Sequence, residues 1–442
     1  MGLGALGGSA TSLRVVGLLL LDPGRAWTLA ELGSALGPQI GRRTLIRGLN
    51  RLVADGFVTK VDPPHGYLVY GANTRHRLYA ELRGIAVKTL GGVGSPADHA
   101  LEDRRAPGPP ASAQAGPSFA VVGSTTVDIF LTGLDRIPGA GSDEFTTDAI
   151  AFVDDAPAVV IGGNGANTAY VLAGLGEQAT LCSVIGDDLP GSIVLGWLRG
   201  RAMSLDGLAI GRERATAATV VAMDRGRNRA AFHHPGGTFG FAPEQVPAAV
   251  LAGSGVVLLT SYHLLPRFRT SEGRAILAAA REGGAITALD LGPALPPLAD
   301  LDELGAVLNH VTYLLANEHE LTSCAGVDDL DTACARLLDA GASTIVVKRG
   351  AAGAAVVEAA GRRDVPGYVV SARSTVGAGD SFNAGFLASV ARGEGAVEAA
   401  RFGNAVAALV VESAVGVLGS PTRAEVLAFV ARQGDGAGRA GR

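Results

Sequence analysis

Residues 374–385 of this 442-residue sequence, STVGAGDSFNAG, combine small residues with an acid in a way that suits phosphate chemistry. Gly377, Ala378 and Gly379 allow the backbone to approach a ligand closely, and Asp380 follows them where an apolar helical pattern begins. The N–H groups of a helix's first turn have no intrahelical partner, and the helix dipole there favours negative charge. We therefore predict an anion-binding cradle, with Asp380 placed to take a proton from an incoming hydroxyl group.

Common phosphate-binding motifs are absent from the sequence. A Walker A loop places a lysine directly after a glycine, and the three lysines, Lys60, Lys88 and Lys348, all follow other residues. The signature motifs of protein kinases are also missing. If this chain transfers phosphoryl groups, the segment 377–380 must hold the phosphate.

The composition indicates an α/β protein of more than one domain. A chain of 442 residues exceeds one ordinary domain, and its 48% hydrophobic residues suffice for a large core. The 63 glycines suit tight turns between strands and helices. Three widely spaced cysteines, Cys182, Cys324 and Cys334, predict neither a disulfide framework nor a zinc site, so we expect a cytoplasmic protein. We expect no membrane association, because no stretch approaches the ~20 apolar residues of a membrane span and the N-terminus lacks a basic signal-peptide start.

Residues 1–90 differ in charge from the remainder of the chain. They carry 11 Lys and Arg against 5 Asp and Glu, a net charge of +6, whereas the other residues carry 26 against 37, a net charge of −11. A basic segment on an acidic body suggests two tasks, one of them nucleic-acid binding.

The pattern within 1–90 predicts three helices followed by a hairpin, and a capping box at Thr28–Glu31 opens the second helix. The helices are Leu13–Leu21, 28–37 and Gly41–Asp55, and the hairpin strands are Val58–Val61 and Tyr67–Tyr70. This order resembles a winged helix-turn-helix with 41–55 as its recognition helix. The resemblance implies binding to double-stranded DNA through Arg42, Arg43, Arg47 and Arg51. The alternative is a small helical docking domain whose arginines form a solvated face.

Residues 91–117 predict a flexible linker, because Pro, Gly, Ser and Ala prevail there without apolar periodicity. Beyond it, short apolar strands alternate with helical stretches over 118–432, which indicates one α/β domain with a parallel sheet and helices on both faces. Asp143–Ile161 and Thr216–Phe232 break this alternation and predict the strands of a small lid. Residues 433–442 predict a disordered tail.

Two ordered motifs in this domain resemble the signatures of the ribokinase-type (PfkB) carbohydrate kinases. Residues 375–382, TVGAGDSF, are similar to the family's C-terminal signature, and residues 162–169, GGNGANTA, to its N-terminal one. The resemblance covers residues 118–430. It implies a ribokinase-like α/β fold, a parallel-sheet sandwich with a small β lid. It also implies ATP-dependent phosphorylation of a primary sugar hydroxyl, with Mg²⁺ as cofactor.

The resemblance also assigns roles to single residues. Asp380 would be the catalytic base, and Gly377, Ala378 and Gly379 would form the anion hole. The residues that would bind the sugar are Asp128, Gly162, Gly163, Asn164 and Asn167. Those that would bind the nucleotide are Asn317, Lys348, Gly350, Gly353, Thr375 and Asn404. Glu320 would bind Mg²⁺ through water. Gly162 and Gly163 would form the hinge of the lid. From the residues alone, a helix N-cap with a first-turn acid is the favoured explanation of Asn317 and Glu320.

Three positions depart from the family pattern. Ser374 stands where the family usually has an Asp that helps to form a monovalent-cation site, which argues against potassium activation. Asn164 stands where ribokinases proper often have a lysine, so ribose itself is not favoured. Residues Asp290–Ala294 lack the Asn and Arg of a family segment that could contact acidic or phosphorylated substrates.

These observations predict an ATP-dependent sugar kinase with a DNA-binding module that could couple it to transcription, acting as a cytoplasmic homodimer. One alternative is a transcription regulator that senses a sugar or nucleoside on a kinase fold. Another is a nucleoside kinase, because nucleosides and sugars present similar hydroxyls to Asp128. Asp380 favours an enzyme, since a pure sensor needs no base at that position.

Overall fold

The computed structural model describes residues 15, 19, 27–36, 42–54, 57–61, 69–72, 117–137, 150–151, 153, 155–226 and 228–439. The chain divides into two compact units, Met1–Ala113 and Gln114–Arg442. This division falls within the predicted linker 91–117, of which only Pro117 belongs to the described residues.

The first unit contains helices packed on a small antiparallel sheet. The helices are α2 (Leu29–Leu36) and α3 (Arg42–Ala54), and the strands follow the order β1 (Trp27–Thr28), β3 (Val69–Ala72), β2 (Val58–Val61). The predicted capping box is confirmed: Thr28 N–H donates to Glu31 Oε2 at 2.7 Å, and Glu31 N–H donates to Thr28 Oγ1 at 3.2 Å. Leu45, Leu49 and Leu52 bury the apolar face of α3, as its spacing predicts.

Two features of this unit differ from the sequence-based expectation. The return strand of the hairpin is Val69–Ala72, two residues later than predicted, and it also pairs with the two-residue strand β1. A strand this short has no periodic signal of its own and depends on its partner. The predicted first helix, Leu13–Leu21, and the hairpin turn lie outside the described residues, apart from the buried residues Val15 and Leu19.

The main sheet of the second unit confirms the predicted parallel α/β architecture. Its strands, in spatial order, are β16 (Gly361–Val365), β15 (Ala354–Glu358), β14 (Thr344–Lys348), β13 (Tyr313–Asn317), β12 (Ile286–Asp290), β11 (Val256–Leu259), β4 (Ser118–Val122), β7 (Gln178–Gly186) and β8 (Ser204–Gly211). Neighbours from β14 to β8 are parallel, whereas β15 and β16 form an antiparallel edge.

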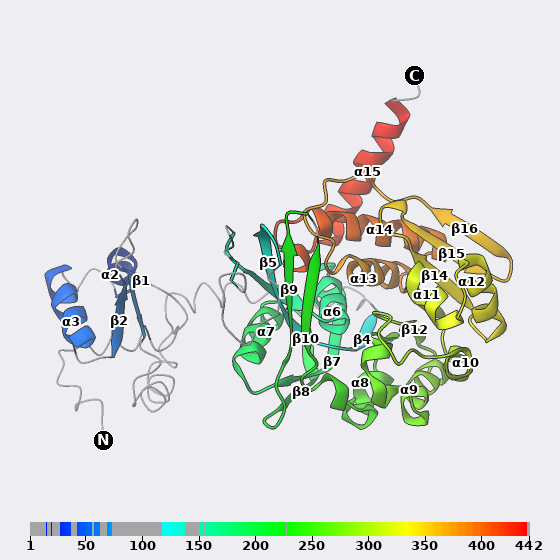
Figure 1. The fold of residues 1–442 in the computed structure, drawn as a ribbon, viewed down its shortest axis with the longest axis horizontal. Coiled ribbons are helices and arrows are strands. Elements are labelled where there is room, and N and C mark those ends of the chain that lie inside the picture. The colour runs from blue at the N-terminus through cyan, green and yellow to red at the C-terminus, as the bar shows by residue number, and fades with distance from the viewer. Residues whose placement is uncertain are drawn as a thin grey trace, which may run out of the picture. The chain divides into compact units, whose positions relative to one another are not determined.

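Helices cover both faces of this sheet (Figure 1). One face carries α6 (Asn164–Gly174), α13 (Ala378–Val390) and α14 (Ala396–Glu412), and the other α9 (Ser271–Glu282), α10 (Leu301–Leu308), α11 (Glu318–Ala325) and α12 (Leu330–Asp339). Successive residues of a strand point to opposite faces, so Phe119 and Val121 join one core and Ala120 and Val122 the other. The remaining helices are α7 (Leu189–Arg199), α8 (Ala248–Ala252) and α15 (Arg423–Arg439).

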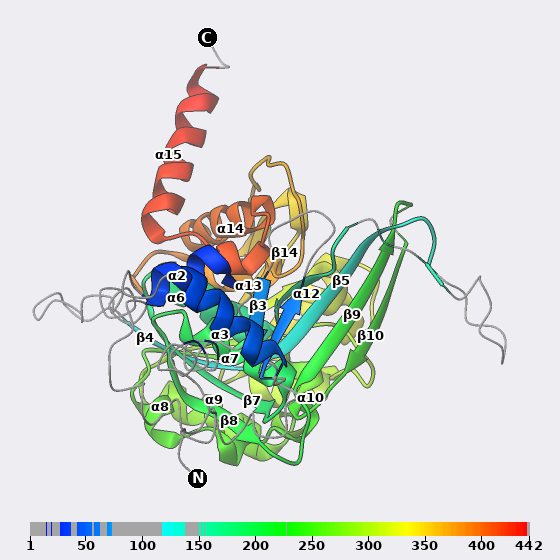
Figure 2. The same ribbon diagram turned by 90° about the vertical axis from the view of Figure 1, so that its left-hand side faces the viewer.

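A second, smaller sheet forms the lid. Its order is β10 (Arg229–His234), β9 (Ala217–Asp224), β5 (Thr126–Leu134), β6 (Ala158–Gly162). In Figure 2, β5, β9 and β10 run side by side as long strands away from the helices. Both stretches predicted as lid contribute strands, but β5 was not predicted, and residues 143–149 lie outside the described part of the chain.

The last helix overlaps the segment that the sequence predicts as a tail. The predicted tail begins at Gln433, yet α15 continues to Arg439. The stretch after Gln433 is rich in glycine and lacks an apolar stripe, so it has no helical pattern. Within the described residues, no helix is both long and apolar enough to cross a membrane.

A buried acid links the ends of three helices on one face of the main sheet. Glu177, just after α6, has a fully buried side chain and accepts from Arg392 Nη2 at 2.7 Å and Nε at 3.1 Å. Arg423, at the start of α15, lies 3.9 Å from the same carboxylate oxygen. Three helix ends therefore meet at one carboxylate.

We expect Glu177→Ala to lower the free energy of unfolding by about 1–3 kcal/mol, because two arginines lose their acceptor at a buried position. The measurement is chemical denaturation of the full chain followed by circular dichroism. Glu398→Ala is the matched control: its pair with Arg401 is exposed and 3.8 Å long, and the change should stay within about 0.5 kcal/mol. Equal effects of the two variants would contradict the prediction.

Candidate active site

The strand order places a ligand crevice beside the first strand of the main sheet. From β4 the chain continues to β7 on one side, while β11 and the later strands extend the sheet on the other side. In such sheets, ligands bind outside the carboxyl ends of the strands where the order reverses. The loops after β4 and β11 meet here, with Ser124 Oγ and Ser261 Oγ 2.7 Å apart, and Ser261 Oγ donates to Asn164 Oδ1 at 3.2 Å.

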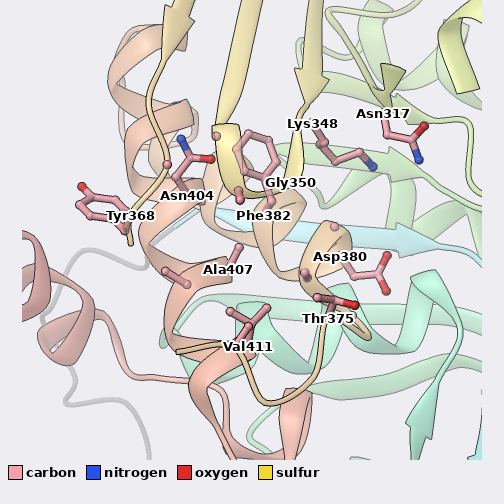
Figure 3. A pocket seen from close by; sticks show the side chains of 18 of the residues that line it. Asn317, Lys348, Gly350, Tyr368, Thr375, Asp380, Phe382, Asn404, Ala407 and Val411 are labelled. Carbon is pink, nitrogen blue, oxygen red and sulfur yellow. The ribbon is translucent and has the colours of Figure 1, made fainter. Parts of the chain in front are cut away.

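A cavity of about 750 Å³ opens at the same edge of the sheet. It is lined by the cradle 377–380, the ends of β13 and β14 and the segment 367–372, and Figure 3 shows its side chains. Its volume lies within the range of small-molecule and cofactor sites. Apolar side chains, Phe382, Val411 and Ala407, form one wall, and Tyr368 lies beside them. The sequence-based analysis did not identify this wall.

The predicted cradle is the N-terminus of α13. Gly377 is the N-cap residue with a φ of 73°, in the left-handed region, and a Cβ there would collide with Val417. Ala378 and Gly379 form the first turn. Ala378 N–H donates a long bond of 3.3 Å to Thr375 O, so one of the N–H groups expected to face an anion has a partner in this conformation.

Asp380 follows the cradle and is only 8% exposed. Burial raises the pKa of its carboxyl group to about 6, while hydrogen bonds from Asn167 and Asn164 act against this rise. Asn167 Nδ2 donates to Asp380 Oδ2 at 2.8 Å. The carboxylate is therefore ionised at neutral pH and is a stronger base than an ordinary Asp. The structure brings together the predicted base, two predicted sugar residues and the cradle.

Asp128 lies on a strand of the lid. It is the third residue of β5, and its Oδ1 accepts from Thr126 Oγ1 at 2.7 Å. Burial raises the pKa of its carboxyl group. Gly162 pairs with Thr126 across the sheet, and a Cβ on Gly162 would overlap both the Thr126 hydroxyl and the Asp128 carboxylate. Gly162 thus leaves the space that Asp128 occupies.

Gly163 has a packing role as well. It is the N-cap of α6 with a φ of 85°, and a Cβ there would lie 2.6 Å from Ser124 O. Any other residue would therefore be strained and would push the Ser124 loop away. These contacts account for both glycines, and the hinge role stays a prediction.

Asn317 and Glu320 form the helix cap that the residues alone favour. Glu320 N–H donates to Asn317 Oδ1 at 2.8 Å, and both carboxylate oxygens of Glu320 accept from Asn317, at 2.7 and 2.8 Å. Both residues also line the cavity, and burial raises the pKa of Glu320 to about 7. The same pair is therefore both a structural cap and a part of the site.

The donor set fits Mg²⁺ held mainly through water. Asn317 and Glu320 supply hard oxygen atoms to the cavity, and no group of three or more metal-binding side chains occurs among the described residues. Mg²⁺ usually keeps several waters and takes one or two carboxylates together with substrate phosphates.

The remaining predicted nucleotide residues, Lys348, Gly350, Gly353, Thr375 and Asn404, all line the cavity. Gly350 and Gly353 have positive φ values, 56° and 92°. Asn404 holds a neighbouring segment in place. Its Nδ2 donates to Val365 O at 3.2 Å and to Pro366 O at 3.1 Å, directly before the segment 367–372 that lines the cavity.

Of the predicted DNA-binding residues in the first unit, Arg42, Arg43 and Arg47 are exposed on α3. The side chain of Arg51 is not among those described.

The site defines a phosphotransferase, and comparison with known proteins identifies its family. A sequence model described as pfkB family carbohydrate kinase matches residues 141–423. The chain belongs to this family of carbohydrate kinases and is an enzyme of that class.

Several relatives support this assignment. The chain is 30% identical over 274 residues to the ATP-dependent ribose-1-phosphate kinase of Halopiger xanaduensis, across 62% of this chain and 88% of that protein. It is 27% identical over 311 residues to the ribokinase of Bacillus subtilis, across 70% of this chain and 98% of that protein. The ribokinase of Thermotoga maritima superimposes with a TM-score of 0.60 at 25% identity, over 71% of this chain and 99% of that chain. The ribokinase-like fold is thus shown.

A base must be ionised to accept a proton. We therefore expect the rate of phosphoryl transfer to fall as the pH drops below about 6, the pKa of Asp380. Well above that pH, Asp380 stays ionised and its titration should no longer change the rate. Asn167→Ala removes a hydrogen bond to the charged form. It should therefore raise the pKa of Asp380 and move this limb upward by about one pH unit. The measurement is the initial rate against pH with any accepted sugar or nucleoside.

Thr168→Val is the control for this shift. Thr168 Oγ1 donates at 3.4 Å to the main-chain oxygen of Asp380, not to its carboxylate, so the limb should stay in place. Any transition from Glu320 near pH 7 should also stay, because Asn167 has no bond to it. A profile unchanged in Asn167→Ala would contradict the assignment of the limb to Asp380.

Proposed function

We propose that this enzyme transfers the γ-phosphoryl group of ATP to a primary hydroxyl of a sugar. The observation that carries the proposal is the pairing of Asp380 with Asn167 beside the cradle, at the point where the nucleotide-sized cavity meets the sugar-side residues. A base with a pKa of about 6, held 2.8 Å from an amide, is ready to take a hydroxyl proton at neutral pH.

Each residue has a stated part in the proposed reaction. Asp128 accepts hydrogen bonds from sugar hydroxyls, and Asn164 and Asn167 direct one hydroxyl toward Asp380. Asp380 takes its proton while the main-chain N–H groups of the cradle stabilise charge on the phosphoryl oxygens. The lid excludes water, which would otherwise accept the phosphoryl group. Mg²⁺, held by Glu320 and Asn317 through water, would neutralise phosphate charge when bound.

The sugar is a second part of the proposal. Relatives include proteins described as ribokinase, as ATP-dependent ribose-1-phosphate kinase and, in Methanothermobacter thermautotrophicus, as nucleoside kinase. Asn164 in place of a lysine disfavours ribose, and a neutral sugar or nucleoside suits the carboxylate and amides of the sugar side. A pure sensor is the remaining alternative.

The proposed homodimer is supported by an apolar row on one face of the lid. Across the strands, Val159, Ile129, Val220 and Phe232 lie in one cross-strand row, with Val159 40% and Phe232 66% exposed. The neighbouring row contains Asp128, Thr219 and His233, so the lid has a polar and an apolar face. An exposed apolar row of this kind is typical of an interface.

To test the activity, we would assay a panel of sugars and nucleosides with ATP and Mg²⁺. Asp380→Asn should lower turnover by about 10²–10⁴-fold for every accepted substrate, while ATP still binds. Asp187→Asn, the same change at a side chain 63% exposed, is the control and should leave turnover unaltered. An Asp380→Asn enzyme working at a tenth of the parent rate would exclude Asp380 as the base.

We also propose that the first unit binds double-stranded DNA. The proposal is supported by the charge of +6 on residues 1–90 and by three exposed arginines, Arg42, Arg43 and Arg47, on α3 next to a hairpin. This helix and hairpin have the order of a winged helix-turn-helix. A docking role for the same face is the alternative.

Full-length protein should bind DNA from upstream of its own coding sequence with a salt-dependent affinity. Replacing Arg42, Arg43 and Arg47 by alanine together should weaken binding and reduce the slope of log K against log salt by about three. Arg432→Ala, an exposed arginine of the second unit, is the control. Parent affinity no higher than for a scrambled duplex would favour docking.

A further inference from the structure

One lysine lies among three acids at the carboxyl edge of the main sheet. Lys348 is the last residue of β14, and it is the only lysine after residue 88. Its side chain is 14% exposed, and its Nζ donates to Asp290 Oδ1 at 2.5 Å. Asp290 is fully buried, and its other oxygen accepts from Thr260 Oγ1 at 2.7 Å. Both carboxylate oxygens of Asp290 therefore accept a hydrogen bond.

The lysine faces the cavity and borders the cradle. Figure 3 shows Lys348 extending into the cavity toward Asn317, on the side where Asp380 lies. A Cβ built on Gly379 would lie 3.7 Å from Lys348 Nζ. The ammonium group is therefore next to the turn whose N–H groups would hold a phosphoryl group.

The ammonium has donors to spare and stays protonated. A lysine carries three N–H donors, and among the described residues Asp290 is its one hydrogen-bond acceptor. Burial lowers its pKa, but the negative charges of Asp290, Glu320 and Asp380 outweigh burial, so the pKa is raised. Lys348 is thus a permanent cation beside the cradle.

A purely structural ion pair explains these facts less well. Buried pairs can often be replaced by apolar residues without loss of stability, and Lys348 follows the core residues Val346 and Val347, where an apolar side chain would extend the strand's pattern. A structural pair also needs no access to a ligand cavity, whereas Lys348 lines one.

We propose that Lys348 is a catalytic cation that contacts the transferred phosphoryl group, with Asp290 and Thr260 as the residues that position it. This inference rests on the proposed kinase function. The sugar oxygen forms a bond to the γ-phosphorus, the bond from that phosphorus to the bridging oxygen breaks, and ADP leaves with the electron pair. Asp380 takes the hydroxyl proton. Lys348 keeps its protons and neutralises charge on the phosphoryl oxygens.

The test compares Lys348→Met with Asp290→Asn in the full-length protein. Lys348→Met removes the charge at nearly constant length and should lower kcat by about 10²–10³-fold. It should also abolish any preference for ATP over ADP in calorimetric binding, because ADP lacks the phosphoryl group that Lys348 contacts. Asp290→Asn keeps the ammonium and the Thr260 contact, so its kcat should fall less than tenfold.

Chemical rescue separates the charge from the fold. Lys348→Cys treated with 2-bromoethylamine regains an ammonium of lysine's length, and both kcat and the ATP preference should return. The native cysteines Cys182, Cys324 and Cys334 are buried, and burial raises the pKa values of their thiols to about 12, 12 and 11, so they should not react. Mass spectrometry should show one adduct, and thermal unfolding should show folded variants.

The outcomes distinguish a failure of the proposed kinase activity from a failure of the role proposed for Lys348. A parent protein that phosphorylates nothing in the panel would refute the kinase proposal, yet the ATP preference would still report on Lys348. A Lys348→Met enzyme with kcat within threefold of the parent and an unchanged ATP preference would overturn the inference alone. Equal losses in Lys348→Met and Asp290→Asn, without rescue, would assign the pair a structural role.

Discussion

The hydrogen bond from Asn167 to Asp380 is the contact on which the rest of the site depends. It joins α6 to α13 across a sequence separation of 213 residues, and so links the residues proposed to bind the sugar to the cradle. The two helices pack in one core through Ala166, Tyr170 and Phe386. Burial drives the carboxyl group toward its neutral form, and this amide acts against that shift. The carboxyl group of Asp380, with a pKa of about 6, is consequently ionised at neutral pH.

The sequence predicts those structural features that depend only on residues close together in the chain. The central strands β4, β11, β12, β13 and β14 are buried on both faces, so each reads as an unbroken apolar run and was predicted. Strand β5 is half-exposed over most of its length and has a register shift between Leu131 and Leu134, so it carries no such run and was missed. The cradle and Asp380 were predicted because a helix N-terminus is local too.

Partners distant in sequence could not be predicted in this way. Lys348 and Asp290 lie 58 residues apart, on strands that are not adjacent, and no spacing rule connects them. Asn404 lines the cavity, but its bonds to Val365 and Pro366 depend on how the loop after β16 returns across α14. The exposed face of α3, by contrast, follows from helical periodicity alone.

The described lining of the cavity carries more acidic than basic side chains. Its described lining contains one cationic side chain, Lys348, together with the acids Glu320 and Asp380. A nucleoside triphosphate would bring several more negative charges, which the ionised carboxylate of Asp380 would repel. Main-chain N–H groups at the start of α13 supply only partial positive charge. Under the proposed function, nucleotide binding would therefore draw on a cation that arrives with the nucleotide and on Lys348, which pairs with Asp290 at the carboxyl end of β14.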